Sequence, residues 1–274
     1  MRVFVTGAPG FIGTAVVHEL LGAGHQVVGL TRSDVGAAFL EEAGAEVHRG
    51  SLEDLDSLRS GAADADGVIH LAFNHGFADF AAALAADLRA VETMGAALEG
   101  TGKPFIITAH LNGEASANAA FSLSGVRSVV VSLSPSVHDM GDHGFVPMLI
   151  AIARAKGVSA YIGDGANRWP AVHRLDAAHL FRLALESAPA GSRFDGVGDE
   201  GVPFRDIAEV IGCHLNVPLA SLASEEASDH FGPFLGTVAA RDFPRSSTAT
   251  QELLGWRPVH PGLLADIEQH YFNN

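Results

Sequence analysis

VFVTGAPGFIG, the stretch from Val3 to Gly13, decides the fold that we expect for this chain. Its first residues, Val3–Thr6, form an apolar run that is typical of a buried strand. Three glycines follow at intervals of three residues, and the segment Phe11–Ala23 then has the apolar spacing of a helix. The stretch therefore predicts a strand, a tight turn and a helix in direct succession.

The three glycines predict what this turn binds. Gly7 permits the tight turn, Gly10 lets the backbone approach a pyrophosphate, and Gly13 allows the helix to pack closely on the sheet. The N-terminus of the helix, beginning at Phe11 and Ile12, offers amide N–H groups and a positive dipole to phosphates. We therefore predict a dinucleotide-binding loop.

Strand-like and helix-like segments alternate through the first half of the chain, which is the pattern of βαβ units. We expect strands at Gln26–Thr31, Glu46–Arg49, Gly67–Leu71, Pro104–Thr108, Ser128–Leu133 and Arg193–Val197. We expect helices at Val35–Ala43, Leu55–Ala62, residues 76–98 and Glu114–Ser122. The predicted fold class is α/β, a Rossmann-like doubly wound parallel sheet.

The rhythm loosens after Pro135, where we expect a second part of the molecule. Residues 1–135 and about 176–198 are assigned to the dinucleotide-binding domain. Residues 136–175 and 199–274 are assigned to a smaller, interleaved C-terminal lobe that binds the substrate. Within this lobe Phe145–Lys156 and Pro203–His214 have helical spacing.

Composition excludes several classes of partner. The formal net charge of -15 argues against a nucleic-acid backbone, and no apolar run is long enough to cross a bilayer. A single cysteine, Cys213, gives no disulfide framework and fits a reducing compartment. We expect a cytoplasmic protein with a small-molecule substrate and neither a nucleic-acid nor a membrane partner.

The end of the second expected strand indicates which dinucleotide is bound. An acidic residue at this point would hold the ribose 2′-hydroxyl of NAD. The chain instead has Thr31 followed by Arg32 and Ser33, and a guanidinium beside a hydroxyl suits a 2′-phosphate. NADP(H) is therefore favoured, while Asp34 keeps NAD(H) as the alternative.

Four further stretches, taken with the glycine loop, resemble the extended or atypical short-chain dehydrogenase/reductase superfamily, in its NAD-dependent epimerase/dehydratase branch. They are RGSLEDLDSL, VIHLAF, SPSVHDMGDHGF and WPAVHRLDAAHLFRLAL. The resemblance implies a homodimer formed through the alanine-rich helix. It also implies cofactor contacts at the adenine, the ribose and the nicotinamide carboxamide, which map respectively to Ser51 and Leu52, to Leu71, Ala72 and Phe73, and to Pro135 and Val137.

The superfamily's proton donor is a tyrosine followed at the fourth position by a lysine, and this chain lacks that pair. Its two tyrosines are Tyr161 and Tyr271, and neither is followed by such a lysine. In the segment that should carry the pair, ITAHLNGEASANAAFSLSG, we interpret His110 as the replacement acid or base. Thr108 would orient a substrate oxygen, and Glu114 would orient His110 or act itself.

Several residues are expected to line the substrate site. They are His138, His143, Trp169 and His173, together with Asn74 from the dinucleotide-binding domain. His138, Asp142 and His143 have side chains of metal-ligating type, but we predict no metal site. Asp176 is interpreted as the N-cap of a helix, and Arg168 and Arg174 as solvated arginines that have a lesser prospect of binding an anionic substrate group.

Three functions remain open at this point. The first is an NADP(H)-dependent oxidoreductase acting on a carbonyl, imine or activated alkene, with non-standard proton transfer. The second is a redox-neutral enzyme on the same scaffold, such as a cyclase, dehydratase or isomerase. The third is a non-catalytic NADP(H)-binding sensor. The first is favoured because the glycine loop is intact.

Overall fold

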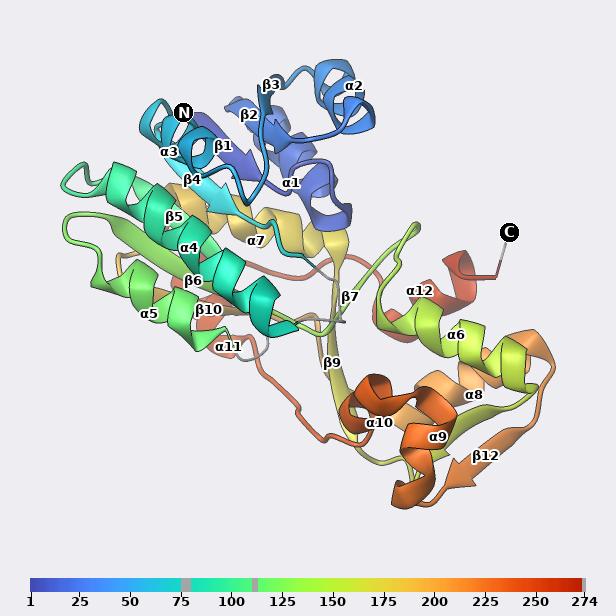
Figure 1. Cartoon of the computed structure of the whole chain (residues 1–274). Coiled ribbons are helices and arrows are strands. Elements are labelled where there is room, and N and C mark those ends of the chain that lie inside the picture. The colour runs from blue at the N-terminus through green and yellow to red at the C-terminus, as the bar shows by residue number, and fades with distance from the viewer. Residues whose placement is uncertain (75–79, 110–112, 273–274) are drawn as a thin grey trace. The chain divides into compact units, whose positions relative to one another are not determined.

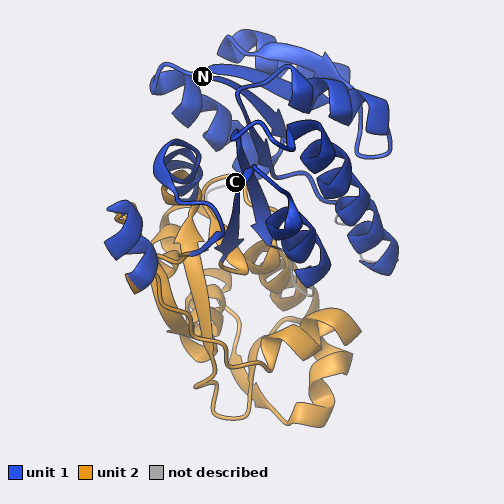
Figure 2. Cartoon of the chain, turned by 90° about the vertical axis from the view of Figure 1, so that its left-hand side faces the viewer, with its two compact units in different colours: residues 1–133, 177–194, 249–256 blue, residues 134–176, 195–248, 257–274 orange. Residues whose placement is uncertain are grey.

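The computed structural model describes residues 1–74, 80–109 and 113–272, and its chain forms two compact units (Figures 1 and 2). Unit 1 comprises residues 1–133, 177–194 and 249–256, and unit 2 comprises residues 134–176, 195–248 and 257–274. The sequence analysis assigns all of residues 199–274 to the substrate lobe, but residues 249–256 belong to unit 1. Their helix, α11 (Thr248–Leu254), clusters mainly with unit 1.

Unit 1 is built on a seven-stranded sheet with the order β10-β6-β5-β4-β1-β2-β3. The strands are β1 (Arg2–Thr6), β2 (Gln26–Thr31), β3 (Glu46–Arg49), β4 (Gly67–His70), β5 (Pro104–Ala109), β6 (Arg127–Leu133) and β10 (Ser192–Gly196). The pairs from β6 to β3 are parallel. The order reverses between β1 and β4, and doubly wound sheets bind ligands at such a switch point.

The helices of unit 1 are α1 (Phe11–Gly22), α2 (Asp34–Ala43), α3 (Leu55–Ala63), α4 (Phe80–Leu98), α5 (Glu114–Ser122) and α7 (Arg174–Ser187), the last of which begins in residues assigned to unit 2. One core cluster joins the sheet to α3, α4 and α5 through fully buried side chains such as Phe4, Leu58, Met94 and Phe105. Figure 1 shows α4 and α5 side by side. The predicted fold class is confirmed, and most predicted element ends in unit 1 agree with the observed ones, the others differing by one residue except at the start of α4.

Unit 2 contains two small sheets that the sequence analysis largely missed. In the first, β9 (Arg168–His173) pairs in parallel with β7 (Ser136–His138) and antiparallel with β11 (Asp199–Pro203). In the second, β8 (Ser159–Ile162) pairs in parallel with β12 (Leu219–Leu222). The helices are α6 (Phe145–Lys156), α8 (Phe204–Leu215), α9 (Ala227–Phe231), α10 (Pro233–Ala239) and α12 (Leu263–His270), with a short 3-10 turn at Ser224–Glu226.

Candidate functional site

The glycine loop of unit 1 leaves no room for side chains. Gly7 has φ +69°, and a Cβ on it would lie 2.8 Å from the Ala72 nitrogen. A Cβ on Gly13 would lie only 2.0 Å from the carbonyl oxygen of Gly7. Gly10 is the N-cap of α1 and has no side chain to cap the helix amides. The loop therefore has the shape that lets a pyrophosphate approach the start of α1.

Residues after β2 form the second part of this site. Arg32 is exposed and makes no ion pair within the described part of the chain. The Ser33 hydroxyl accepts a hydrogen bond from the Gly36 N–H (3.0 Å) and so caps α2. Asp34 pairs with Arg49 at 2.8 Å, and its side chain is 99% exposed. The carboxylate of Asp34, which would favour NAD, thus forms an ion pair with Arg49, whereas the guanidinium of Arg32 has no ion pair among the described residues.

The other cofactor residues implied by the resemblance divide between the two units. Thr31 and Leu52 are buried, and the Ser51 hydroxyl accepts the Glu53 N–H. Leu71, Ala72 and Phe73 follow β4, and the ring of Phe73 makes an edge contact with that of Phe80. Pro135 and Val137 belong to unit 2, before and within β7.

Four buried polar side chains connect the glycine loop to α4 and α5. The Thr6 hydroxyl lies 2.6 Å from Nδ1 of His70, and Nε2 of His70 lies 3.1 Å from Asp87. The Ser116 hydroxyl donates to the other oxygen of Asp87. All four side chains are at most 4% exposed. The Thr108 hydroxyl, which we expected to orient a substrate oxygen, instead donates to the backbone oxygen of His70 at 3.1 Å.

The remaining catalytic candidates of unit 1 receive no support. His110 lies outside the described residues. Both carboxylate oxygens of Glu114 accept hydrogen bonds from Arg193, at 3.1 and 3.0 Å, and the Glu114 side chain is 69% exposed. This pairing gives Glu114 a role in joining α5 to β10 rather than in proton transfer. Asn74 donates to Glu53 at 3.1 Å.

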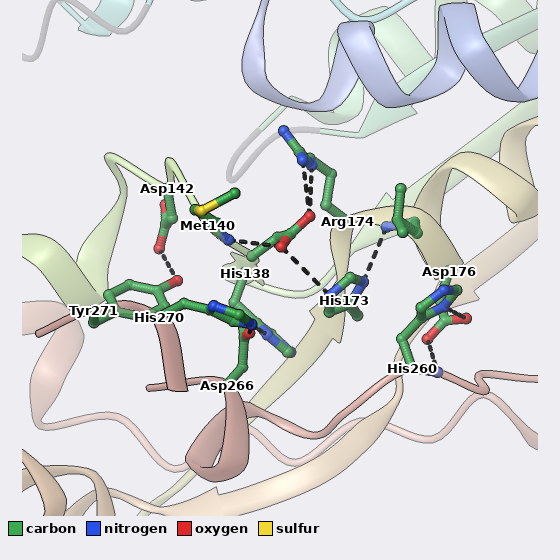
Figure 3. A network of polar contacts seen from close by, with 12 residues as sticks. His138, Met140, Asp142, His173, Arg174, Asp176, His260, Asp266, His270 and Tyr271 are labelled. Atoms are coloured by element: carbon green, nitrogen blue, oxygen red, sulfur yellow. Dashed lines mark hydrogen bonds and ion pairs between the residues drawn. The ribbon is translucent and has the colours of Figure 1, made fainter. Parts of the chain in front are cut away.

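A network of histidines and carboxylates occupies one region of unit 2 (Figure 3). Nδ1 of His138 lies 2.8 Å from Oδ2 of Asp266, and both side chains are at most 1% exposed. Within the described part of the chain, His138 Nε2 and Asp266 Oδ1 are buried without a hydrogen-bond partner. Nε2 of His270 lies 3.6 Å from Asp266 Oδ1, which is an ion-pair distance and not a hydrogen bond. Because burying polar atoms without hydrogen bonds costs free energy, this dyad calls for a functional explanation.

His173 lies beside His138 in the paired strands β7 and β9. Its Nδ1 accepts the Leu175 N–H (3.2 Å), so His173 caps the start of α7. Its Nε2 lies 3.7 Å from Asp139, which also binds Arg174 at 2.8 Å. Burial lowers the pKa of His173, partly offset by the Asp139 carboxylate.

One ligand atom each of Asp139, His173 and Asp266 lies within 4.8 Å of the others, a spacing that could suggest a metal site. The hydrogen bond from Leu175 argues against it. It places a proton on Nε2 of His173, the nitrogen that faces Asp139, and this leaves no lone pair for a metal. Arg174 also already neutralises Asp139. We therefore keep the prediction of no metal at this cluster.

A hollow of about 610 Å³ adjoins the network. Its lining includes Asp139, Asp142, Ile150, Arg154, His270 and Tyr271. The Tyr271 hydroxyl donates to Asp142 at 2.8 Å. Burial raises the pKa of Asp142, against hydrogen bonds from Gly144 and Tyr271 that lower it, and burial beside Asp142 raises the pKa of Tyr271. Both groups therefore hold their protons more firmly than they would in water.

Several assignments in the lobe need correction. Trp169 is fully buried, with its ring 5.0 Å from that of Phe204, so it belongs to the core of unit 2 and not to a substrate surface. His138 is also fully buried, but its Nε2 has no hydrogen-bond partner among the described residues and keeps it a candidate acid or base, and His143 is exposed. Asp176 lies inside α7 and accepts the backbone N–H groups of Val259 and His260, so it is not the N-cap.

Arg168 and Arg174, which the sequence analysis considered for a substrate anion, are each held by a carboxylate of the chain. Arg168 makes a two-pronged ion pair with Asp242, and Arg174 makes one with Asp139. Arg168 is nevertheless solvated, with 49% of its side chain exposed, whereas Arg174 is only 22% exposed. Arg154, at the hollow, is exposed and has no ion pair within the described residues.

Sequence reasoning missed three acidic residues of these networks, although each carried a signal. Asp87 and Asp266 lie on the apolar faces of their helices, beside Ala83 and Val91 and beside Leu263 and Ile267 respectively. A lone carboxylate in such a stripe must be paired once it is buried. Asp139 had no comparable signal, because it directly follows the unpredicted strand β7.

The fold and the loop together define a dinucleotide-binding protein of the doubly wound class, and the comparisons agree. Residues 3–98 match the model of the NAD dependent epimerase/dehydratase family. The chain is 48% identical to an uncharacterized protein of Schizosaccharomyces pombe, covering 97% of this chain and 98% of that protein. It is 45% identical to an uncharacterized protein of Saccharomyces cerevisiae over 100% of both.

Solved structures share the fold at low identity. UDP-glucose 4-epimerase of Thermotoga maritima aligns with a TM-score of 0.74 and 18% identity, covering 98% of this chain and 96% of that one. The dTDP-glucose 4,6-dehydratase DesIV of Streptomyces venezuelae, solved with NAD, gives 0.76 and 16%, covering 98% and 95%. These likenesses show the fold.

Residues 3–98 of the chain thus belong to the NAD dependent epimerase/dehydratase family. Among the described residues, no helix combines the length and the apolar character that a membrane span requires.

Proposed function

We propose that this chain is an NADP(H)-dependent oxidoreductase that acts on a small-molecule carbonyl, imine or activated alkene. The observation that supports it is the glycine loop at β1 and α1 together with Arg32 after β2, which is exposed and makes no ion pair among the described residues. When bound, the nicotinamide would supply or accept the hydride. The chain's own residues bind the phosphates, orient the substrate and move the proton.

The preference for NADP(H) rests on charge at the ends of β2 and α2. A 2′-phosphate there would receive the Arg32 guanidinium, the Ser33 hydroxyl and the positive end of α2. Asp34, the residue that would serve NAD, is turned to Arg49. The arrangement therefore supports NADP(H) over NAD(H).

We place the substrate at the hollow of unit 2. Arg154 offers a cation that makes no ion pair among the described residues, Ile150 offers an apolar surface, and Tyr271 offers a hydroxyl that is hydrogen-bonded to Asp142. Because burial raises the pKa of Asp142, this carboxyl retains a proton at a higher pH than an exposed aspartate. We therefore propose Asp142 as the proton donor in place of the absent Tyr–Lys pair, with Tyr271 positioning it through their hydrogen bond.

The direct test is deuteride transfer from NADPH that carries deuterium at the reactive carbon, offered with a panel of carbonyls, imines and activated alkenes. We expect a product containing deuterium, and we expect Tyr271→Phe to slow its formation. Turnover without deuterium in the product would contradict hydride transfer. Tight binding of NADPH with no turnover of any panel member would support the sensor instead.

A redox-neutral enzyme on the same scaffold is the second candidate, because of the His138–Asp266 dyad. A histidine oriented by a carboxylate through one nitrogen, with its other nitrogen unpaired, is the arrangement of a general base. This function predicts substrate conversion at an unchanged ratio of oxidised to reduced dinucleotide. It also predicts loss of that conversion in Asp266→Asn with the fold retained, and full conversion by this variant would exclude it.

We further propose a cytoplasmic homodimer whose substrate is a small molecule, with neither nucleic acid nor membrane as a partner. Alanines 81, 82, 85 and 96 of α4 are exposed, and small exposed side chains allow two helices to pack closely. Sedimentation of the purified protein tests the dimer, and a monomer mass at micromolar concentration would exclude it.

A further inference from the structure

The buried chain from Thr6 through His70 and Asp87 to Ser116 has no counterpart in the function proposed so far. Its members come from β1, β4, α4 and α5, so one set of hydrogen bonds joins four elements. Ser116 lies in the segment where the superfamily's Tyr–Lys pair would be expected. In this chain, that segment instead contributes a hydroxyl to a network behind the dinucleotide loop.

The positions of the protons in this chain follow from its contacts. Both oxygens of Asp87 accept hydrogen bonds, one from the Ser116 hydroxyl and one from Nε2 of His70. Nε2 must therefore carry a proton. Nδ1 of His70 then meets the Thr6 hydroxyl at 2.6 Å, and this hydroxyl can donate to a neutral ring or accept from a charged one. In either state, Asp87 determines how the ring is turned.

The other end of the network touches the glycine loop. The Thr6 hydroxyl accepts the Ala72 N–H at 3.3 Å, and Thr6 directly precedes Gly7. Gly7 packs so closely on Ala72 that a Cβ on Gly7 would lie 2.8 Å from the Ala72 nitrogen. Thr6 thus joins the end of β1 to the exit of β4 at the switch point of the sheet. Its position depends on a histidine that Asp87 orients.

We infer that Asp87 is a positioning residue for the dinucleotide loop, acting through His70 and Thr6, and that Ser116 of α5 supports it. The inference rests on the proposed dinucleotide binding. A carboxylate accepts both hydrogen bonds in a fully buried place and strengthens them by its charge, whereas an amide is uncharged and would have to reverse its hydrogen bond with the Ser116 hydroxyl.

The experiment is a calorimetric titration of NADPH into the wild-type chain and into Asp87→Asn, with Glu92→Gln as the matched control. Glu92 is an exposed carboxylate on the same helix. We expect Asp87→Asn to weaken NADPH binding about ten-fold or more, as for loss of a charge-assisted hydrogen bond, and Glu92→Gln to bind like the wild type. Equal affinity in Asp87→Asn, with wild-type binding intact, would overturn the inference alone.

Two further measurements separate positioning from general stability. Thr6→Ser keeps the hydroxyl and should bind NADPH like the wild type, whereas Thr6→Val, similar in size, should show the weakened binding. In the nitrogen-15 spectrum of the histidines, His70 of the wild type should show a protonated Nε2. An unprotonated Nε2 in the wild type, or equal affinities of Thr6→Ser and Thr6→Val, would overturn the inference. Failure of the wild type to bind either dinucleotide would overturn it together with the proposed function.

Discussion

Arg32 and Asp34 are two residues apart, and their different surroundings carry the argument about the cofactor. Asp34 is bound to Arg49, whereas the guanidinium of Arg32 has no ion pair among the described residues. An exposed arginine binds a doubly charged phosphate strongly, because the hydrogen bonds between them are charge-assisted. The sequence indicates NADP(H) from the residue type of Arg32 alone. The structure adds that Asp34, the residue that would favour NAD(H), forms an ion pair with Arg49.

Replacement of Arg32 tests this argument. We expect Arg32→Ala to weaken NADPH binding about ten-fold and to leave NADH binding nearly unchanged, because only NADPH carries the 2′-phosphate. Arg59→Ala is the control, since Arg59 is also a partly exposed arginine but pairs with Asp56 on α3. The measurement is a titration of each variant with both dinucleotides. An equal loss for both would mean that Arg32 acts on the loop and not on the phosphate.

At the scale of elements, the start of α7 depends on a side chain that the sequence did not assign to it. We expected the N-cap to be Asp176, but the helix begins at Arg174 and His173 accepts the Leu175 N–H. Asp176 lies inside the helix and accepts hydrogen bonds from the backbone N–H groups of Val259 and His260. The error arose because aspartate is the commoner cap, while the strand that positions His173 was not predicted.

The pH dependence of stability should report this histidine. Burial lowers the pKa of His173 from its ordinary value near 6.5, against Asp139 and Asp266, which raise it, and with His138 and His260, which lower it further. The unfolded chain therefore binds this proton more tightly than the folded one. The stability contributed by the neutral ring is present above about pH 6.5 and is lost as the pH falls.

His173→Asn isolates the effect, because asparagine can still accept the Leu175 N–H but does not titrate. We expect its unfolding temperature to fall less steeply than that of the wild type between about pH 7 and pH 5. Thermal unfolding followed by circular dichroism at several pH values gives the comparison. If the unfolding temperatures of the two proteins fall in parallel with pH, protonation of His173 does not contribute to the pH dependence of stability.

At the scale of the whole molecule, the two units differ in how well the sequence predicted them. Unit 1 repeats one pattern, an apolar strand followed by a helix, and its strands Gln26–Thr31 and Glu46–Arg49 were placed to the residue. Unit 2 depends on β7, β9 and β11, which are short and include proline, histidine and serine. Periodicity cannot detect such strands, because long-range pairing and not local preference forms them.

The same contrast applies to the candidate sites. The glycine loop could be predicted because Gly7 and Gly13 are required by local geometry. The networks of Asp87 and Asp266 could not, because their partners are 17 to 128 residues away along the chain. Only the folded chain brings such residues together. This is also why the proton donor proposed here, Asp142 with Tyr271, differs from the His110 suggested by the sequence.

The measurement that tests the central claim most directly is a calorimetric titration of the wild-type protein with NADPH and, separately, with NADH. The account predicts saturable binding of NADPH with one site per chain, and NADH binding at least about ten-fold weaker, as expected for the 2′-phosphate at Arg32. Binding of neither dinucleotide would contradict the account, since the glycine loop would then serve the fold alone.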